Sequence, residues 1–107
     1  MSKTKRIKFI GHAKLWTDAD RNGGTAYCSV RVTRCSDGEV LTSPMESRMG
    51  DGYKAAALGM MSAAGWLPGY EQSYMIYERE NDYPIEWIAE EVRSMKTCES
   101  HGEGRAI

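Results

Sequence analysis

The sequence predicts an α+β fold of two layers, in which helices pack on one face of an antiparallel sheet. Residues 7–16 alternate between apolar and polar side chains, which is typical of a half-buried strand. A glycine-rich turn at residues 50–52 precedes an alanine-rich segment whose apolar residues have helical spacing. A second apolar stripe with this spacing follows in residues 85–95. We therefore expect the element order β-β-β-α-β-α.

The length and composition of the chain are those of one globular domain. With 107 residues, 41% of them hydrophobic and 27% charged, we expect residues 1–107 to share a single core. The formal net charge of -1 argues against a non-specific coat for nucleic acid. Ten Lys or Arg and six Asp or Glu fall in residues 1–54, whereas four and nine fall in residues 55–107. This uneven charge suits a protein that binds a partner, although two solvated patches explain it equally well.

The cysteines and the start of the chain predict the compartment. Three cysteines, an odd number without paired spacing, argue against a disulfide framework. The basic start runs into the alternating segment rather than into the apolar stretch of a signal peptide. No apolar run reaches the length of a membrane span. We therefore expect a cytoplasmic protein without membrane association, whose cysteines are reduced: Cys28, Cys35 and Cys98.

Three strands and two turns account for the first half of the chain. The first strand, residues 7–16, leads into a loop with the hairpin signal Asn22-Gly23. In the second strand, residues 26–33, the apolar side chains fall at every second position. A tight turn at residues 36–38 precedes a third strand that begins at Glu39, and Pro44 ends this strand or confines it to an edge. Together they predict a three-stranded antiparallel meander with one apolar face.

Two helices and one further strand are expected in the second half. A helix from about residue 51 to 64 covers the apolar face of the meander, and Gly65 provides its left-handed stop. Residues 72–79 alternate as a fourth strand, and a second helix begins at Pro84 and runs to about residue 96. We expect residues 97–107, which are polar and rich in glycine, to form a flexible tail.

No arrangement of residues predicts a catalytic, metal or cofactor site. The two histidines, His12 and His101, lie in no nucleophile or metalloprotease motif. Cys98 and His101 have a spacing that can hold a metal, but two ligands do not make a site. We therefore expect a protein that is not an enzyme and carries no cofactor.

The turn at residues 50–52 and the exposed aromatic side chains are the candidate binding features. Backbone N–H groups at a helix start, with Lys54 in the first turn, can receive an anion; a plain turn that begins a helix is the alternative. Tyr and Trp offer a large contact area at low entropic cost, so the aromatic residues of the outer sheet face suit a protein interface. The residues predicted to bind a partner are Trp16, Tyr27, Arg31, Arg48, Gly50, Gly52 and Lys54.

Residues 39–64 resemble the second half of a double-stranded-RNA-binding domain. There, three antiparallel strands lead through a glycine-rich turn, here GDGYKAAA at residues 50–57, into a helix whose start grips phosphates. The resemblance implies a nucleic-acid-binding module. The chain departs from this family in lacking a leading helix and in having a single lysine, Lys54, in place of a basic cluster.

The pattern Gly-x-Gly-Tyr-Lys-x-x-Ala-Leu at residues 50–58 is also similar to small accessory proteins of bacteriophages and mobile elements, of the anti-CRISPR type. This resemblance implies a phage-encoded, non-enzymatic inhibitor in the cytoplasm of a bacterial host cell, which occludes a surface of a defence complex such as CRISPR-Cas. It makes a host protein or ribonucleoprotein complex the expected partner, with nucleic acid as the alternative. It leaves the oligomeric state open.

Overall fold

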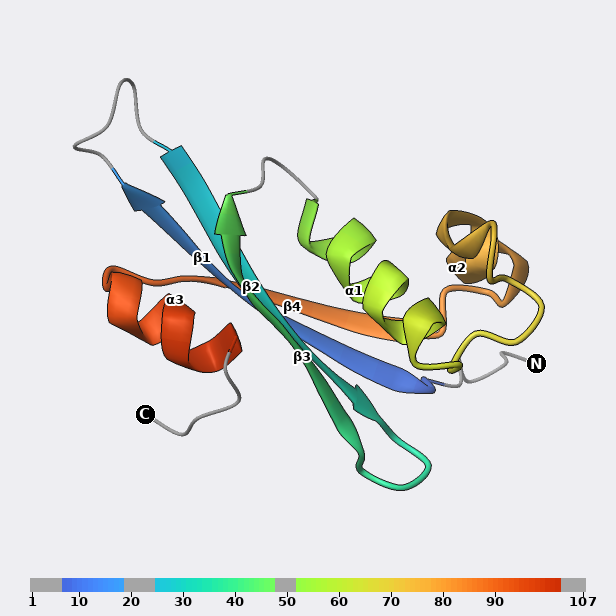
Figure 1. The fold of residues 1–107 in the computed structure, drawn as a ribbon. Helices are drawn as coiled ribbons and strands as arrows, with labels where there is room; N and C mark the ends of the chain where they lie inside the picture. Colours follow the sequence, from blue (N-terminus) through green and yellow to red (C-terminus); the bar gives the residue numbers. More distant parts are fainter. Residues whose placement is uncertain (1–6, 19–24, 48–51, 103–107) are drawn as a thin grey trace, which may run out of the picture.

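The computed structural model describes residues 7–18, 25–47 and 52–102, which form one sheet and the helices that pack on it (Figure 1). The predicted α+β class is confirmed. Some of the sequence-based expectations lie outside the described residues: the hairpin signal Asn22-Gly23, Arg48, Gly50 and the tail residues 103–107. In chain order the elements are β1 (Phe9–Asp18), β2 (Thr25–Arg34), β3 (Val40–Ser47), α1 (Gly52–Ala63), η1 (Tyr74–Ile76), α2 (Tyr77–Glu80), β4 (Ile85–Glu91) and α3 (Met95–Gly102).

The sheet has four strands in the order β3-β2-β1-β4. The first three strands form the predicted antiparallel meander, in which Ala13 lies opposite Val30. The fourth strand, β4, lies beside β1 and runs parallel to it, with Phe9 opposite Ile85. The sheet is therefore mixed, and the prediction of a wholly antiparallel sheet is wrong at this strand.

The second half of the chain also differs from the predicted elements. Residues 72–79, predicted as a strand, contain η1 and most of α2, whereas the predicted helix at 84–96 is β4 followed by the start of α3. The sequence of β4 fits both periods, because its apolar residues recur at helical spacing and also at every second position. Pairing with β1 favours the strand conformation over the helix, since it buries Ile85 to 5% exposure and turns Trp87 toward the core.

The main core lies between α1, α2 and one face of the sheet. Alternate residues of β1 and β2, such as Ala13 and Val32, are fully buried against this layer. The ring of Phe9 stacks on that of Trp66, with the ring centres 5.7 Å apart. It meets the ring of Tyr77 edge-on, with the ring centres 6.4 Å apart. The helical members of the core are Tyr53, Ala57, Leu58 and Met61 of α1 and Tyr77 of α2. The predicted packing of a helix on this face is thus confirmed for α1, and α2, which lies in a segment predicted as a strand, packs on the same face.

The last helix, α3, packs against the opposite face of the sheet. Its contacts are to residues of β1 and β2 that alternate with the core residues. Cys98 Sγ lies 3.6 Å from Ser29 Oγ, and the centres of the His101 and His12 rings are 4.8 Å apart. Gly102 at its end lies directly against the backbone of β3. Residues 97–102, which the sequence assigned to a flexible tail, therefore belong to α3, and the prediction that all helices share one face does not hold for it.

No helix in the described parts of the chain is both long and apolar enough to span a membrane.

Candidate partner-binding surface

The structure distributes the predicted binding residues over two sides of the sheet. Trp16, Tyr27 and Arg31 lie on the face that carries α3, because each alternates with a residue of the main core. Gly52 and Lys54 lie in the first turn of α1, on the other face. These two groups therefore do not form one site.

Two of the predicted residues have structural contacts of their own. Arg31 Nε donates a hydrogen bond of 2.9 Å to the carbonyl oxygen of His101, which ties the end of α3 to β2. The ammonium of Lys54 lies 5.9 Å from the centre of the Trp87 ring, a cation–π distance. Both side chains therefore help to hold helices on the sheet, and binding roles for them remain predictions.

Trp16 and Tyr27 form an aromatic pair at the end of the sheet. They lie directly opposite each other on β1 and β2, their ring centres are 5.4 Å apart, and the ring planes are inclined by 31°. Both side chains are half-buried. The pair stabilises the strand ends, as cross-strand aromatic contacts do, and leaves part of each ring in contact with solvent.

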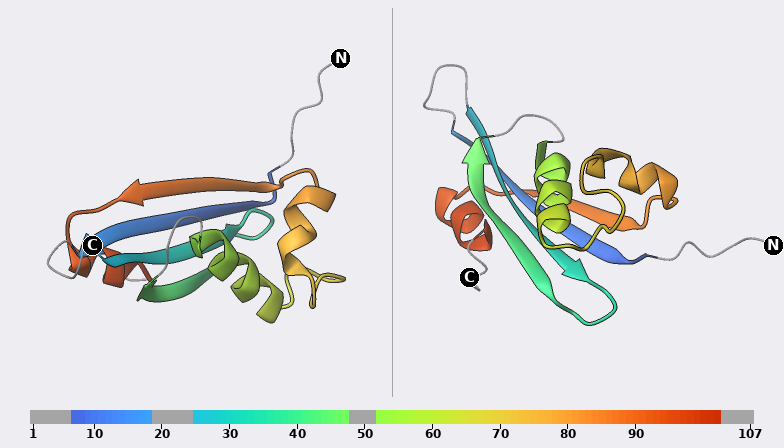
Figure 2. Two further views of the ribbon diagram at one scale, coloured as in Figure 1. Left: turned by 90° about the horizontal axis from the view of Figure 1, so that it is seen from above. Right: turned by 45° about the vertical axis from the view of Figure 1, so that its right-hand side comes forward.

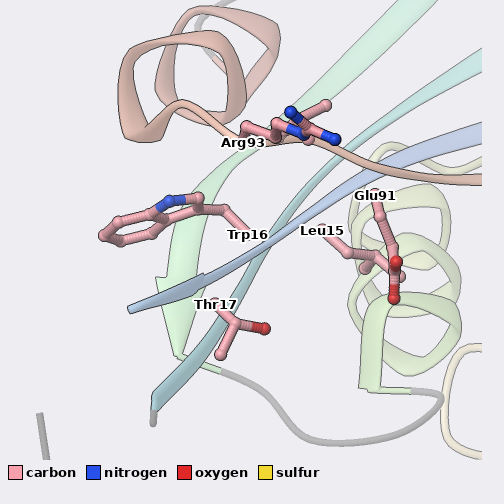
Figure 3. Close-up of a pocket in the computed structure, with 6 residues that line it drawn as sticks. Leu15, Trp16, Thr17, Glu91 and Arg93 are labelled. Atoms are coloured by element: carbon pink, nitrogen blue, oxygen red, sulfur yellow. The ribbon is translucent and has the colours of Figure 1, made fainter. Parts of the chain in front are cut away.

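A cavity of about 560 Å³ lies beside Trp16, where β1 and β4 separate. Just after β4, Val92 N donates a backbone hydrogen bond of 2.8 Å to Leu15 O of β1. Beyond this bond the chain leaves β1 and crosses to α3. The cavity therefore results from the strand ends diverging. Its lining consists of Leu15, Trp16 and Thr17 from one segment and Glu91, Val92 and Arg93 from the other (Figure 3).

The side chains around this cavity combine apolar surface with both charges. Figure 3 shows Trp16 and Arg93 on the side of β1 that faces α3, and Leu15 and Glu91 on the side of α1. On the α3 side of the hollow, the indole of Trp16 and the guanidinium of Arg93 can together receive a side chain that is partly apolar and partly polar, while the carboxylate of Glu91 lines the other side. Arg93 and Glu91 were missed in the sequence because the predicted helix at 84–96 placed them on its solvent side.

Beneath α3 lies a cluster of polar and titratable groups. His101 is 3% exposed, and its Nε2 lies 2.8 Å from the carbonyl oxygen of His12. Burial lowers the pKa of His101 and raises the pKa of the Cys98 thiol. Cys98 Sγ lies 3.4 Å from the carbonyl oxygen of Lys14. Within residues 7–18, 25–47 and 52–102, no group of three His, Cys, Asp or Glu side chains is placed to hold a metal ion.

A second, smaller cavity of about 360 Å³ lies at the opposite end of β1. One of its lining residues, Arg34, is held by ion pairs of 2.7 Å with both Asp37 and Glu39. The guanidinium also lies 4.5 Å from the centre of the Trp66 ring. Because its charge is already matched by two carboxylates, this arrangement stabilises the β2–β3 turn rather than presenting a cation to a ligand.

Comparisons of the chain with protein-family models, with curated proteins and with solved structures gave no match.

Proposed function

We propose that this protein is a non-enzymatic binding protein that acts by covering part of the surface of a partner protein. The observation that carries the proposal is the half-buried pair of Trp16 and Tyr27 beside the cavity at the ends of β1 and β4. Residues of these two types dominate the energy of protein interfaces, because they combine large area with few rotatable bonds.

The cavity adds a specific feature to the aromatic pair. Interfaces gain most of their affinity where an anchoring side chain fills a hollow and excludes water. Arg93 and Glu91 line the hollow beside Trp16, so that an incoming side chain can be oriented by charge as well as by shape. We therefore expect a partner to insert an anchoring side chain into this hollow.

The resemblance to phage accessory proteins suggests the class of partner. In this proposal the protein is phage-encoded and inhibits a defence complex of the bacterial host, such as a CRISPR-Cas ribonucleoprotein. It does so by occluding a surface of that complex. Specific interfaces bury about 800 Å² on each partner, more than two aromatic side chains can supply, so further contacts from the surrounding sheet end are part of the proposal.

Binding of nucleic acid is the second candidate. The observation that favours it is the succession β1, β2, β3 and α1, which matches the order of the second half of a double-stranded-RNA-binding domain, with Lys54 in the first turn of the helix. It ranks second because the Lys54 ammonium already lies over the Trp87 ring.

The test starts with capture of partners from bacterial lysate on the immobilised protein, with and without nuclease, followed by mass spectrometry. The captured partner is then purified and its affinity is measured for the wild type and for the double variant Trp16→Ser/Tyr27→Ser. We expect the variant to lose at least about tenfold in affinity. Met75→Ser, which removes an apolar side chain that is 60% exposed on η1, is the matched control and should bind as the wild type does.

The outcomes separate the two candidates. A protein partner that resists nuclease and binds with weak dependence on salt supports surface occlusion. Recovery of nucleic acid alone, with affinity that falls steeply as salt is raised, supports the second candidate instead. Equal affinity of the double variant and the Met75→Ser control would reject the aromatic pair as the binding surface.

A further inference from the structure

We propose that the outer edge of β4 is a second binding surface, which accepts an extended, positively charged segment of a partner protein as a fifth strand of the sheet. The order β3-β2-β1-β4 places β4 at one end of the sheet. In the left view of Figure 2, β4 is the outermost strand and no coloured helix or strand runs alongside its outer side.

The backbone of β4 presents hydrogen-bonding groups along this edge. Successive residues of a strand direct their peptide groups to opposite edges. On the inner side, Phe9 N donates to Pro84 O and Val92 N donates to Leu15 O, so the even-numbered residues of this segment face β1. The peptide groups of Trp87, Ala89 and Glu91 therefore face outward, and no described residue makes a backbone hydrogen bond with them.

The other end of the sheet is protected, whereas β4 is not. In β3, Pro44 lacks an N–H group, and the end of α3 lies against the strand, with the Cβ position of Gly102 at 2.7 Å from Ser43 O. The seven residues of β4 contain no proline and no lysine, and its pairing with β1 is continuous from Ile85 to Glu91. An edge of this kind is a ready template for strand addition.

The side chains of β4 define the charge of the strand that fits. Glu86, Glu90 and Glu91 are all exposed, and β4 has no basic residue. Glu90 also lies 3.5 Å from His12 and 3.6 Å from Lys14, but 52% of its side chain remains accessible. Between the acids Ile88 is 46% exposed. A strand with Lys or Arg opposite the glutamates and an apolar residue opposite Ile88 complements this edge.

A second copy of this chain is a poor occupant of the same edge. If two β4 strands paired antiparallel around Ile88, Glu86 of each copy would lie opposite Glu90 of the other. Like charges directly opposite each other destabilise a strand pair, and here the repulsion would occur twice. The sequence of β4 therefore disfavours self-association and favours a basic partner.

The inference does not rest on the proposed function, although the β4 edge shares Glu91 with the lining of the cavity beside Trp16. The outward-facing peptide groups belong to Trp87, Ala89 and Glu91, whereas the aromatic pair belongs to β1 and β2. A variant that blocks the β4 edge leaves Trp16 and Tyr27 in place, and a variant of Trp16 or Tyr27 leaves the β4 edge unchanged.

The test uses the synthetic seven-residue peptide Lys-Lys-Thr-Val-Thr-Lys-Lys, which in either strand direction places Lys opposite Glu86, Glu90 and Glu91 and Val opposite Ile88. The control is the same peptide with Glu in place of each Lys. Binding to the full chain is measured by titration, and amide hydrogen exchange is followed by NMR. We expect the lysine peptide to bind and to slow exchange at the amides of Trp87, Ala89 and Glu91, because these groups become donors to the added strand. The glutamate peptide should do neither.

Two variants make the test specific to the edge. Ala89→Pro removes an outward N–H group without touching the inward groups that pair with β1, and should abolish protection by the peptide. Glu86→Lys/Glu91→Lys should weaken binding of the lysine peptide about tenfold and allow binding of the glutamate peptide. Glu71→Lys/Glu99→Lys makes the same change in net charge at exposed residues on other parts of the chain and should leave binding unchanged.

Several results would overturn the inference. One is a lysine peptide that binds without slowing exchange at the three β4 amides, and another is equal affinity in the charge-reversal and control variants. A concentration-dependent dimer that disappears in Ala89→Pro would show that a second copy occupies the edge and would reject the basic partner. Should Ala89→Pro fail to fold, the charge-reversal pair still decides the question.

Discussion

At the scale of single residues, the turn between β2 and β3 depends on one guanidinium. Arg34 donates from Nε and Nη2 to the two carboxylate oxygens of Asp37 at 3.0 and 2.7 Å, and Nη2 also contacts Glu39. Gly38 in this turn has a φ of 77°, which a residue with a side chain rarely adopts. The hydrogen bonds from Arg34 lower the pKa of Asp37 from 3.8 to about 2.

The low pKa of Asp37 predicts a specific dependence on pH. A carboxyl whose pKa is lower in the folded chain stabilises the fold above its unfolded pKa of 3.8, and this contribution is lost as the pH falls through about 2. We expect Asp37→Asn to lower the free energy of unfolding at pH 6, and the gap to the wild type to close near pH 2. Urea denaturation of both proteins across this range measures the gap. A gap that stays constant down to pH 2 would contradict the role of the ion pair.

Gly102 and Gly59 offer a matched pair of substitutions. A Cβ on Gly102 would lie 2.7 Å from Ser43 O and 2.9 Å from Met45 N, both backbone atoms that cannot easily move aside. We expect Gly102→Ala to destabilise the protein by about 1–3 kcal/mol, measured by urea denaturation, because α3 must shift away from β3. Gly59→Ala, inside α1 with its nearest contact at 3.6 Å, should be neutral or stabilising by up to about 1 kcal/mol. Equal effects of the two changes would show that α3 does not pack closely on β3.

At the scale of elements, local sequence patterns predicted the meander and α1 but neither β4 nor α3. The strands of the meander are neighbours in sequence, and Gly65, with a φ of 77°, ends α1 as predicted. The identity of β4 depends on a partner strand more than 70 positions away, which a local pattern does not contain. The same holds for α3, whose short, polar sequence becomes a helix because Cys98 and His101 are buried against the sheet.

The docking of α3 should depend on pH through His101. Its ring is buried among His12, Lys14 and Arg31, and burial lowers its pKa below the ordinary 6.5. Since the neutral form is favoured in the folded chain, the stability that this residue confers is complete above pH 6.5 and declines as the pH falls below it.

We therefore expect the amides of α3 to open more readily at about pH 5 than at about pH 7.5, while those of α1 change little. Hydrogen exchange, corrected for the intrinsic effect of pH, measures the opening of each helix. His101→Gln keeps a side-chain N–H group but does not titrate, and should remove most of the dependence. A pH dependence that persists unchanged in this variant would show that the effect does not come from His101.

At the scale of the whole molecule, the sheet separates two layers of different character. On one side, aromatic and aliphatic side chains form a continuous core under α1 and α2. On the other side, α3 is held by contacts that are largely polar. The alternation of β1 and β2 placed Trp16 and Tyr27 correctly on the second side, but the cavity beside them depends on where β4 leaves β1, which the sequence did not show.

This asymmetry predicts the order in which the three thiols become reactive. Cys35 is exposed, Cys98 is buried beneath α3, and Cys28 is buried on the face that carries the main core. Alkylation of the native protein, followed by mass spectrometry of peptides, should label Cys35 at once. Cys98 should follow, because only α3 must detach, and Cys28 should react last, because its exposure requires the core to open.

Gly102→Ala tests this order directly, because it weakens the contact of α3 with β3 and leaves the core untouched. We expect the variant to accelerate labelling of Cys98 at least about fivefold, since a loss of about 1 kcal/mol in docking raises the open population by about that factor. Labelling of Cys28 should change much less. If Cys98 and Cys28 instead react at the same rate in both proteins, α3 opens only when the whole sheet does, and the two layers form one cooperative unit.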